Sequence, residues 1–237
     1  MPDSDAVKPD YCLQFDGVND AVAIPHSRAL KFNPNNAFTI ECWFKTSATT
    51  TAAAFAVLLG TWSGATITDP YPYELRFYAG PTFAGGAAIE FVDYDGSIYD
   101  SAFAQGPWNN AEWHHVAGVR RGTKWMGLYI DGVVRVPLTP KSGIGPITNT
   151  RPVTVGAYDN GFAGYKGLID EVRIWNVART KRQIRDNMNV RLPGSTPHLA
   201  GYWKLNDAKG TIAHDATANH NNGTLLNGPV WVPVVGR

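Results

Sequence analysis

The sequence predicts an all-β protein: a two-sheet antiparallel jelly-roll β-sandwich with one short helix near residues 180–188. Three observations lead to this prediction. Strand-like alternation of apolar and polar residues recurs at short intervals, with turn residues between the segments. The charged fraction is 17%, below the ~25% usual for soluble domains, whereas glycine, proline and aromatic residues are plentiful. Only one segment carries the start signals of a helix.

The N-terminal half contains the clearest alternation. In residues 38–45, Ile40, Cys42 and Phe44 share one face of the expected strand, and Trp43 lies on the other. A turn, Asp16-Gly17-Val18-Asn19, separates the first two strands. The strands expected in this half are residues 12–15, 21–24, 38–45, 55–59 and 73–78.

Two segments, residues 61–72 and 93–108, are expected to be long loops that carry aromatic side chains. Long loops inside compact domains are usually functional or disordered. Because both segments hold tryptophan or tyrosine, a functional role is favoured here.

The C-terminal half continues the strand pattern and contains the helix. Asp131-Gly132 predicts a type I′ hairpin, because both central residues need a positive φ. The helix begins at Thr180, with Gln183 as its capping-box partner, and Ile184 and Met188 give it one apolar stripe. The expected strands are residues 113–120, 124–130, 133–136, 153–157 and 167–175.

Composition argues against several partners. The net charge is +1, and the densest basic run, residues 179–185, reads as a solvated helix face. Without a basic stripe, nucleic acid is not expected as a partner. No apolar run approaches the ~18 residues that a membrane span needs. Residues 1–10 are expected to be a flexible segment and have no apolar core, so they cannot be a signal peptide.

The cysteines and histidines give no metal-ligand spacing. Cys12 and Cys42 are either two buried free thiols or a disulfide that joins neighbouring strands. His114 and His115 are consecutive strand residues that face opposite ways, so they cannot chelate one metal together.

Five motifs, in this order and spacing, resemble the laminin-G-like domain of the concanavalin A-like lectin/glucanase superfamily. The resemblance covers residues 11 to about 190 and implies a single sandwich over residues 11–237. The tail, residues 199–237, resembles a stretch that in this family commonly precedes the first strand, and so reads as a permuted closing segment. The matching pieces are Phe15-Asp16-Gly17, Phe38-Thr39-Ile40-Glu41-Cys42-Trp43, Trp113-His114-His115-Val116-Ala117, Tyr129-Ile130-Asp131-Gly132 and Ile169-Asp170-Glu171-Val172-Arg173-Ile174-Trp175.

The resemblance implies a non-catalytic, lectin-like module that binds glycans or glycoproteins, and it favours an extracellular location. The alternatives are a protein-interaction or adhesion domain and, third, a polysaccharide hydrolase or lyase. Exposed sheet edges make an oligomer possible.

A structural Ca²⁺ is a second implication of the resemblance. Regular alternation would place Asp170 inward with Val172 and Ile174, and a buried carboxylate needs a partner. In related folds the corresponding aspartate often helps to hold Ca²⁺; Asp16 and Asp20 are weaker candidates for the same site. The alternative is that Asp170 is satisfied by backbone amides or by groups such as Arg173.

A second metal hypothesis concerns residues 215–223. Oxygen-bearing side chains recur there at every second position, as at the start of an EF-hand loop, but the terminal bidentate Glu is missing. Asx-turns explain the same composition.

Aromatic side chains near the two expected loops are the candidate glycan contacts, because their rings stack on the apolar faces of sugars. The alternative is that they pack the loops. Tryptophans inside strands, at positions 43, 113, 175 and 203, are assigned to packing. The candidate ligand-binding residues are Trp62, Tyr71, Tyr73, Tyr94, Tyr99 and Tyr158, with Asp159 and Asn160 as neighbouring polar groups.

No catalytic residue is predicted. Glycoside hydrolysis needs two carboxylates that flank the glycosidic bond. The nearest pattern, Glu90-Phe-Val-Asp93-Tyr-Asp95, places Glu90 on the opposite face from Asp93 and Asp95 if the strand is regular. The sequence therefore favours a binding module over an enzyme.

Overall fold

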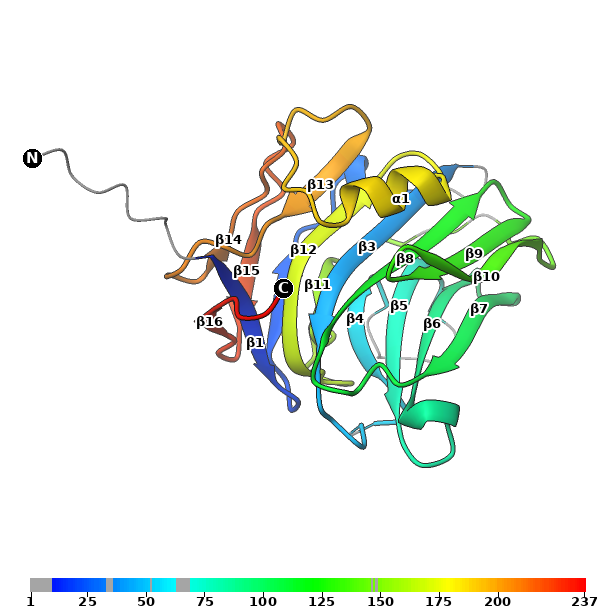
Figure 1. The fold of residues 1–237 in the computed structure, drawn as a ribbon. Coiled ribbons are helices and arrows are strands. Elements are labelled where there is room, and N and C mark those ends of the chain that lie inside the picture. Colours follow the sequence, from blue (N-terminus) through cyan, green and yellow to red (C-terminus); the bar gives the residue numbers. More distant parts are fainter. Residues whose placement is uncertain (1–9, 33–35, 52, 63–68, 146, 148) are drawn as a thin grey trace, which may run out of the picture.

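The computed structural model describes residues 10–32, 36–51, 53–62, 69–145, 147 and 149–237. The described chain forms two antiparallel sheets of eight strands each, packed as a β-sandwich (Figure 1), which confirms the predicted fold class. The expectation of a flexible N-terminal segment falls on residues 1–9, outside the described part, and on Asp10. No helix in the described ranges is long and apolar enough to cross a membrane.

The first sheet has β3 and β12 at its centre and the N-terminal strand near one edge. β13 (Leu199–Trp203) pairs with β12 outside the main path. The strand order is β10 (Val133–Pro140), β9 (Trp125–Ile130), β8 (Trp113–Arg121), β3 (Ala37–Lys45), β12 (Lys166–Trp175), β1 (Tyr11–Asp16) and β16 (Val230–Pro233).

The second sheet corrects one sequence prediction. Most of residues 93–108 is not a loop: β7 pairs with β6 in regular register, from Ala87 opposite Gly106 to Tyr94 opposite Tyr99. Two short 3-10 helices, η1 (Arg28–Leu30) and η2 (Ala84–Gly86), lie in connections. The strand order is β14 (Ile212–Ala213), β15 (Gly223–Leu226), β2 (Ala21–Ile24), β11 (Val153–Val155), β4 (Ala56–Gly60), β5 (Tyr71–Ala79), β6 (Ala87–Tyr94) and β7 (Tyr99–Gly106).

The main core lies between the sheets and is built by the alternation in the sequence. Ile40, Cys42 and Phe44 of β3 point into it, as predicted, while Trp43 packs in a separate cluster on the outer face. The sheets approach closely at Gly118, where a Cβ atom would lie 2.4 Å from the Phe91 ring. Any larger residue at this position would force the two layers apart.

The helix forms where the sequence predicts it. α1 (Lys181–Asn187) has Thr180 as its N-cap: the Gln183 amide donates to the Thr180 hydroxyl at 3.2 Å, and the Thr180 amide donates to the Gln183 side chain at 2.9 Å. Ile184 is buried against Ala117 and Tyr129 of the first sheet. α1 therefore lies on the outer face of that sheet (Figure 1).

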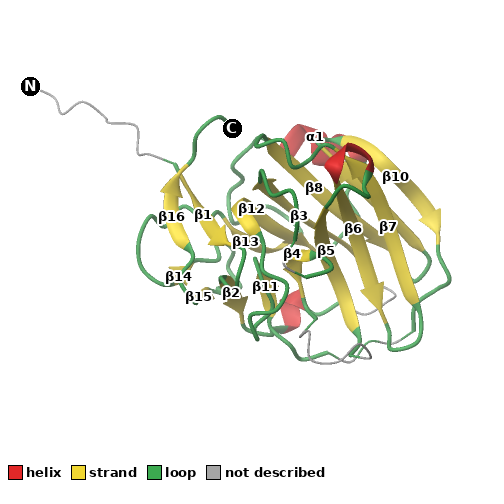
Figure 2. Ribbon diagram, turned by 90° about the horizontal axis from the view of Figure 1, so that it is seen from below, coloured by secondary structure: helices red, strands yellow, loops and turns green. Residues whose placement is uncertain are grey.

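The C-terminal tail borders both sheets. β16 pairs with β1, and β15 pairs with β2, so residues 223–233 lie directly beside residues 11–24. The backbone amide of Val234 also donates to the Asp10 carbonyl at 2.9 Å. Figure 2 shows β16 and β1 at one side of the molecule and β7 at the other.

β12 departs from the regular strand assumed above. A bulge lies between Asp170 and Arg173, and Glu171 has a φ of 53°. As a result, Val172 and Ile174 point into the main core, whereas Asp170 lies opposite Trp43 and faces outward. The prediction that Asp170 shares the inward face with Val172 and Ile174 is therefore wrong.

The two cysteines are buried free thiols. β12 lies between their strands, β1 and β3, and Cys12 packs on the outer face of the sheet while Cys42 packs in the main core. A disulfide between neighbouring strands is excluded by this geometry.

Candidate functional site

The outer face of the second sheet carries a row of charged and aromatic side chains. Along β5, Leu75 and Phe77 enter the core, so Glu74, Arg76 and Tyr78 point the other way. An irregularity between Tyr71 and Glu74 brings the Tyr71 ring onto this outer face as well.

Arg76 is the centre of this face. Its Nε donates to Glu74 Oε1 at 3.0 Å, and its other nitrogens donate to the hydroxyls of Tyr71 at 2.9 Å and Tyr99 at 3.1 Å. The guanidinium also lies 4.2 Å from the centre of the Phe55 ring. Arg76 is 6% exposed, so its charge is held by protein groups rather than by water.

A shallow, open pocket surrounds Arg76. Its volume is about 270 Å³, and aromatic rings from β5, β6, β7 and the neighbouring connections line it. The Trp62 ring lies 5.8 Å from that of Tyr71, which in turn lies 5.9 Å from that of Tyr94. The lining residues are Phe55, Trp62, Tyr71, Arg76, Tyr94 and Tyr99.

The structure therefore brings four of the predicted ligand residues together in one place. These are Trp62, Tyr71, Tyr94 and Tyr99, and the last is 47% exposed. Tyr94 and Tyr99 face each other across the β6–β7 pair, so the hairpin that replaces the expected loop is what positions them. Residues 63–68 of the other expected loop lie outside the described chain.

Tyr158, Asp159 and Asn160 lie beside the pocket. Tyr158 is fully buried; its ring meets Trp62 edge-on at 5.1 Å, and its hydroxyl donates to Glu74. Asp159 and Asn160 are exposed in the following turn, where the Asn160 side chain accepts a hydrogen bond from the Phe162 amide at 3.0 Å. Tyr158 thus supports Trp62 from beneath.

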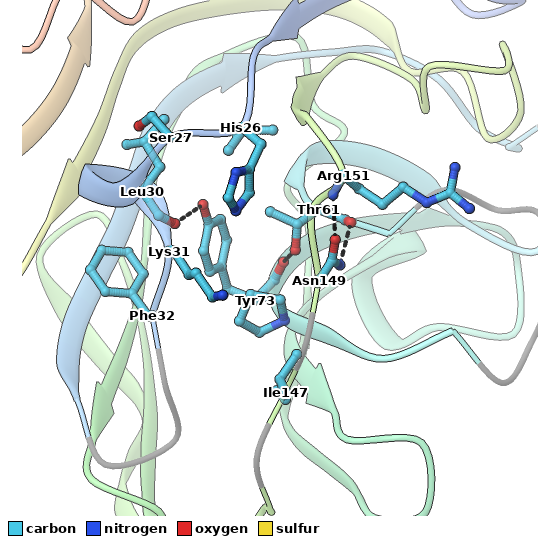
Figure 3. A pocket seen from close by; sticks show the side chains of 12 residues that line it. His26, Ser27, Leu30, Lys31, Phe32, Thr61, Tyr73, Ile147, Asn149 and Arg151 are labelled. Carbon is cyan, nitrogen blue, oxygen red and sulfur yellow. Dashed lines mark hydrogen bonds between the residues drawn. The ribbon is translucent and has the colours of Figure 1, made fainter.

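Tyr73 is not in the pocket. It points between the sheets, where its hydroxyl donates to the Leu30 carbonyl at 3.0 Å (Figure 3). The cavity beside it, which His26 and Asn149 also line, has a volume of only about 10 Å³. That is about the size of a single water, far too small for a sugar. The expectation that Tyr73 is displayed near a loop is wrong, because Tyr73 alternates with Leu75 and Phe77 on the core face of β5.

The acidic residues of β6 face opposite ways, as predicted. Glu90 points outward and accepts a hydrogen bond from the Tyr78 hydroxyl at 2.6 Å. Asp93 points inward, where Arg120 of the other sheet lies 3.2 Å away and also contacts Asp100 at 3.3 Å. Burial raises the pKa of Asp93 to about 8, despite the opposing effect of Arg120. Glu90 and Asp93 therefore cannot act on one substrate.

The residues present do not fit the expected calcium site. Asp170 is fully buried, and its carboxylate is paired with the guanidinium of Arg237, which also lies over the Trp43 ring at 5.7 Å. Asp16 pairs with Lys166 in the β1–β12 register, four residues along the strand from Asp170. The buried carboxylate has an arginine as its counter-charge.

The carboxylates of Asp20 and Asp215 also accept hydrogen bonds from nearby backbone amides. The Asp20 carboxylate accepts a hydrogen bond from the Asp16 amide at 3.0 Å. Asp215 accepts from the amides of Tyr202, Thr217 and Asn221 at 2.9–3.0 Å, which is the Asx-turn alternative. Among the described residues, no three His, Cys, Asp or Glu side chains are grouped so that they could hold a metal.

Fold and site together define a β-sandwich protein with an open aromatic pocket on one sheet face. The family model Laminin_G_3, described as the concanavalin A-like lectin/glucanases superfamily, matches residues 16–185. The chain belongs to this superfamily. A search of curated protein sequences gave no match.

Solved structures show the same fold at low identity. A candidate carbohydrate-binding protein from Bacteroides ovatus ATCC 8483 is similar with a TM-score of 0.65 and 20% identity, over 98% of this chain and 63% of the other. The chain thus spans less than two thirds of that protein. A heptameric SAP-like pentraxin from Limulus polyphemus has a TM-score of 0.53 and 15% identity, over 74% of this chain and 80% of the other. The binding domain of botulinum neurotoxin serotype D has a TM-score of 0.54 and 14% identity, over 73% and 41% of the two chains.

Sequence reasoning missed three residues of the site: Phe55, Glu74 and Arg76. A signal for two of them was present. Residues 73–78 alternate, so Glu74 and Arg76 had to share a face with Tyr78. Phe55 is the first residue of an apolar run whose remaining members form β4, and nothing in the run shows that Phe55 itself packs against Arg76.

Proposed function

We propose that this chain is a non-catalytic carbohydrate-binding module, and that the pocket around Arg76 is where it binds glycans. The observation that carries the proposal is the grouping of Trp62, Tyr71, Tyr94 and Tyr99 in one open depression. Flat aromatic rings cover the apolar faces of pyranose rings, and tyrosine hydroxyls supply hydrogen bonds to sugar hydroxyls.

The geometry of the pocket also suits a sugar. Arg76 ties the hydroxyls of Tyr71 and Tyr99 in place, so these rings are ordered before a ligand arrives. Pre-ordered contacts reduce the entropy that binding has to overcome. Membership in a superfamily of lectins and glucanases, and similarity to a candidate carbohydrate-binding protein, favour the same function.

The positions of the carboxylates near the pocket favour a binding role over hydrolysis. Glu74, the other acid on this face, is fully buried under Arg76 and Tyr158 and does not reach the pocket surface. Glu90 has Asp93 behind it, on the opposite side of the sheet. Because Glu74 is buried, it cannot work with Glu90 on a bound glycan. Because Asp93 lies on the other side of the sheet from Glu90, these two cannot flank a glycosidic bond in the pocket either.

The experiment is a glycan array followed by isothermal titration calorimetry with the best oligosaccharide. Trp62→Ala is expected to weaken binding about 30-fold, because a tryptophan at the centre of a contact typically contributes about 2 kcal/mol. Trp125→Ala is the matched control, since Trp125 is an exposed tryptophan on β9 of the other sheet.

Thermal melts of both variants separate lost contact from lost fold, because Trp62 also packs on Tyr158. If Trp62→Ala melts like the native chain and binds as tightly, the pocket is not the glycan site. If no glycan binds at high protein concentration, the protein-interaction or adhesion alternative takes its place.

A further inference from the structure

The charges beneath the aromatic pocket do not cancel. Glu74 contacts Arg76 through both oxygens, at 3.0 and 3.4 Å, so these two form a neutral bidentate pair. Glu90 lies further from Arg76, at 3.8 Å, and its nearest hydrogen-bond donor is the uncharged Tyr78 hydroxyl. The carboxylate of Glu90 is therefore the excess charge of this cluster.

Arg76 is not free to receive an acidic ligand. Its N–H groups donate to Glu74, Tyr71 and Tyr99. An arginine has five N–H groups, and four of the hydrogen bonds they can make are already taken by the protein. Among the described residues that line the pocket, Arg76 is the one cation.

Arg76 also occupies the rings that a ligand cation would use. Its guanidinium lies over Phe55 at 4.2 Å, over Tyr71 at 5.4 Å and over Trp62 at 5.7 Å. A positive group that entered the pocket would be repelled by the Arg76 guanidinium, and the rings it could stack on already make cation–π contacts with Arg76. The pocket is thus poor for cations as well as for anions.

We propose that the pocket selects uncharged sugars and rejects glycans that carry a carboxylate or sulfate group. This inference rests on the proposed carbohydrate-binding function and names its ligand class. A negative group brought into the pocket would be placed near Glu90, and the described residues that line the pocket offer no unused cation to pair with it, at a cost of about tenfold in affinity.

The test is calorimetry with two sets of hexasaccharide probes that differ in charge. The uncharged set is cellohexaose, xylohexaose and mannohexaose, and the acidic set is hexagalacturonate and hexamannuronate. At low salt, the best uncharged probe is expected to bind at least about tenfold more tightly than any acidic probe. Salt should narrow this gap, because at 1 M the Debye length falls to about 3 Å.

Glu90→Gln identifies the charge responsible. Glutamine can still accept the hydrogen bond from Tyr78, but the negative charge is gone. The ratio of acidic to uncharged affinity is expected to rise about tenfold. Glu112→Gln is the matched control, because it removes the same charge at an exposed position. Glu112 comes immediately before β8 of the other sheet, so its replacement should leave the affinity ratio unchanged.

The outcomes separate the two proposals. If uncharged and acidic probes bind equally, or if acidic probes bind more tightly and lose binding in Trp62→Ala, charge selection is overturned while the glycan site stands. If no probe and no array glycan binds, the proposed function fails and the selection fails with it. Selection that is insensitive to both salt and Glu90→Gln would also contradict the inference.

Discussion

At the scale of single residues, the most unusual group is the Asp93 carboxyl. It is 1% exposed and lies between the sheets with Arg120 and Asp100. One of its oxygens, Oδ1, is buried and accepts no hydrogen bond from the residues that the structure describes. Its pKa of about 8 means that the folded protein holds a proton on Asp93 at neutral pH, whereas an unfolded chain does not.

This proton makes folding depend on pH. Between about pH 4 and pH 8 the folded state binds the proton and the unfolded state has lost it, so Asp93 lowers the free energy of unfolding as pH rises. The slope is up to about 1.4 kcal/mol per pH unit. In Asp93→Asn, which resembles the protonated carboxyl, this slope should disappear in urea titrations at pH 5, 6, 7 and 8.

His115 also makes the free energy of unfolding depend on pH, with the opposite sign, but this does not affect the comparison between Asp93→Asn and the native chain. Burial lowers the pKa of His115 to about 4, so its contribution rises with pH from about 4 to 6.5 in both proteins and cancels in their difference. Asp159→Asn, at an exposed site, is the control. Parallel pH profiles for Asp93→Asn and the native chain would show that Asp93 is ionised in the folded state.

At the scale of elements, the bulge in β12 decides what the strand does. It places Glu171 in the left-handed region, at φ 53°, where its carboxylate pairs with Arg173 and accepts from the Tyr202 hydroxyl at 2.5 Å. Arg191 approaches the other oxygen at 3.2 Å. Glu171 is 2% exposed, and its partners tie β12 to β13 and to the segment after α1.

Glu171→Ala should therefore be strongly destabilising. Within the described part of the chain, it leaves the buried Arg173 guanidinium with Glu41, 3.6 Å away, as its one remaining ion-pair partner. Removing one partner of a buried pair costs about 3 kcal/mol or more. Chemical denaturation with Glu112→Ala as an exposed control measures the difference, and a loss below 1 kcal/mol would mean that the network is solvated.

The sequence predicted elements better than it predicted their irregularities. Alternation in residues 38–45, the Asp131-Gly132 turn and the Thr180 cap are local signals, and each forms the expected element. The outward facing of Tyr71 and of Asp170 depends on irregularities where these strands pair with their neighbours. A period-2 pattern carries no mark of an extra residue, so Asp170 was assigned to the wrong face.

The site was predictable only in part for a similar reason. Trp62, Tyr71, Tyr94 and Tyr99 were found because aromatic side chains in polar segments stand out in a sequence. Their convergence on Arg76 depends on the order of β4 to β7 in the sheet, which pairs residues far apart in the chain. Single-sequence patterns do not contain that order.

At the scale of the whole molecule, the tail joins the two ends of the described chain. β16 borders β1, and beyond it Arg237 lies between the rings of Trp43 and Trp113 and pairs with Asp170. Burial raises the pKa of Asp170, while Arg237 opposes that shift. The last residue of the sequence thus neutralises a charge in the middle of the first sheet.

A double-mutant cycle tests this closure. Arg237→Gln should cost about 3 kcal/mol of unfolding free energy, because it removes the guanidinium that pairs with the buried Asp170 carboxylate. Asp170→Asn combined with Arg237→Gln should be more stable than Arg237→Gln alone, since the unpaired charge is gone. Additive losses in urea titrations would show that the two groups do not act as a pair.

The two cysteines lie in parts of the molecule that become accessible to solvent through different opening motions. Cys12 lies under β16, with its Sγ 3.7 Å from the Val232 carbonyl, and its pKa of about 12 keeps it unreactive while the tail is in place. Cys42 lies in the main core, where burial raises its pKa as well. A thiol reagent can thus reach Cys12 when the tail alone lifts, but it reaches Cys42 only when the sandwich opens. The rate of thiol modification at Cys12 would therefore measure how often β16 detaches, and the rate at Cys42 would measure how often the whole protein unfolds.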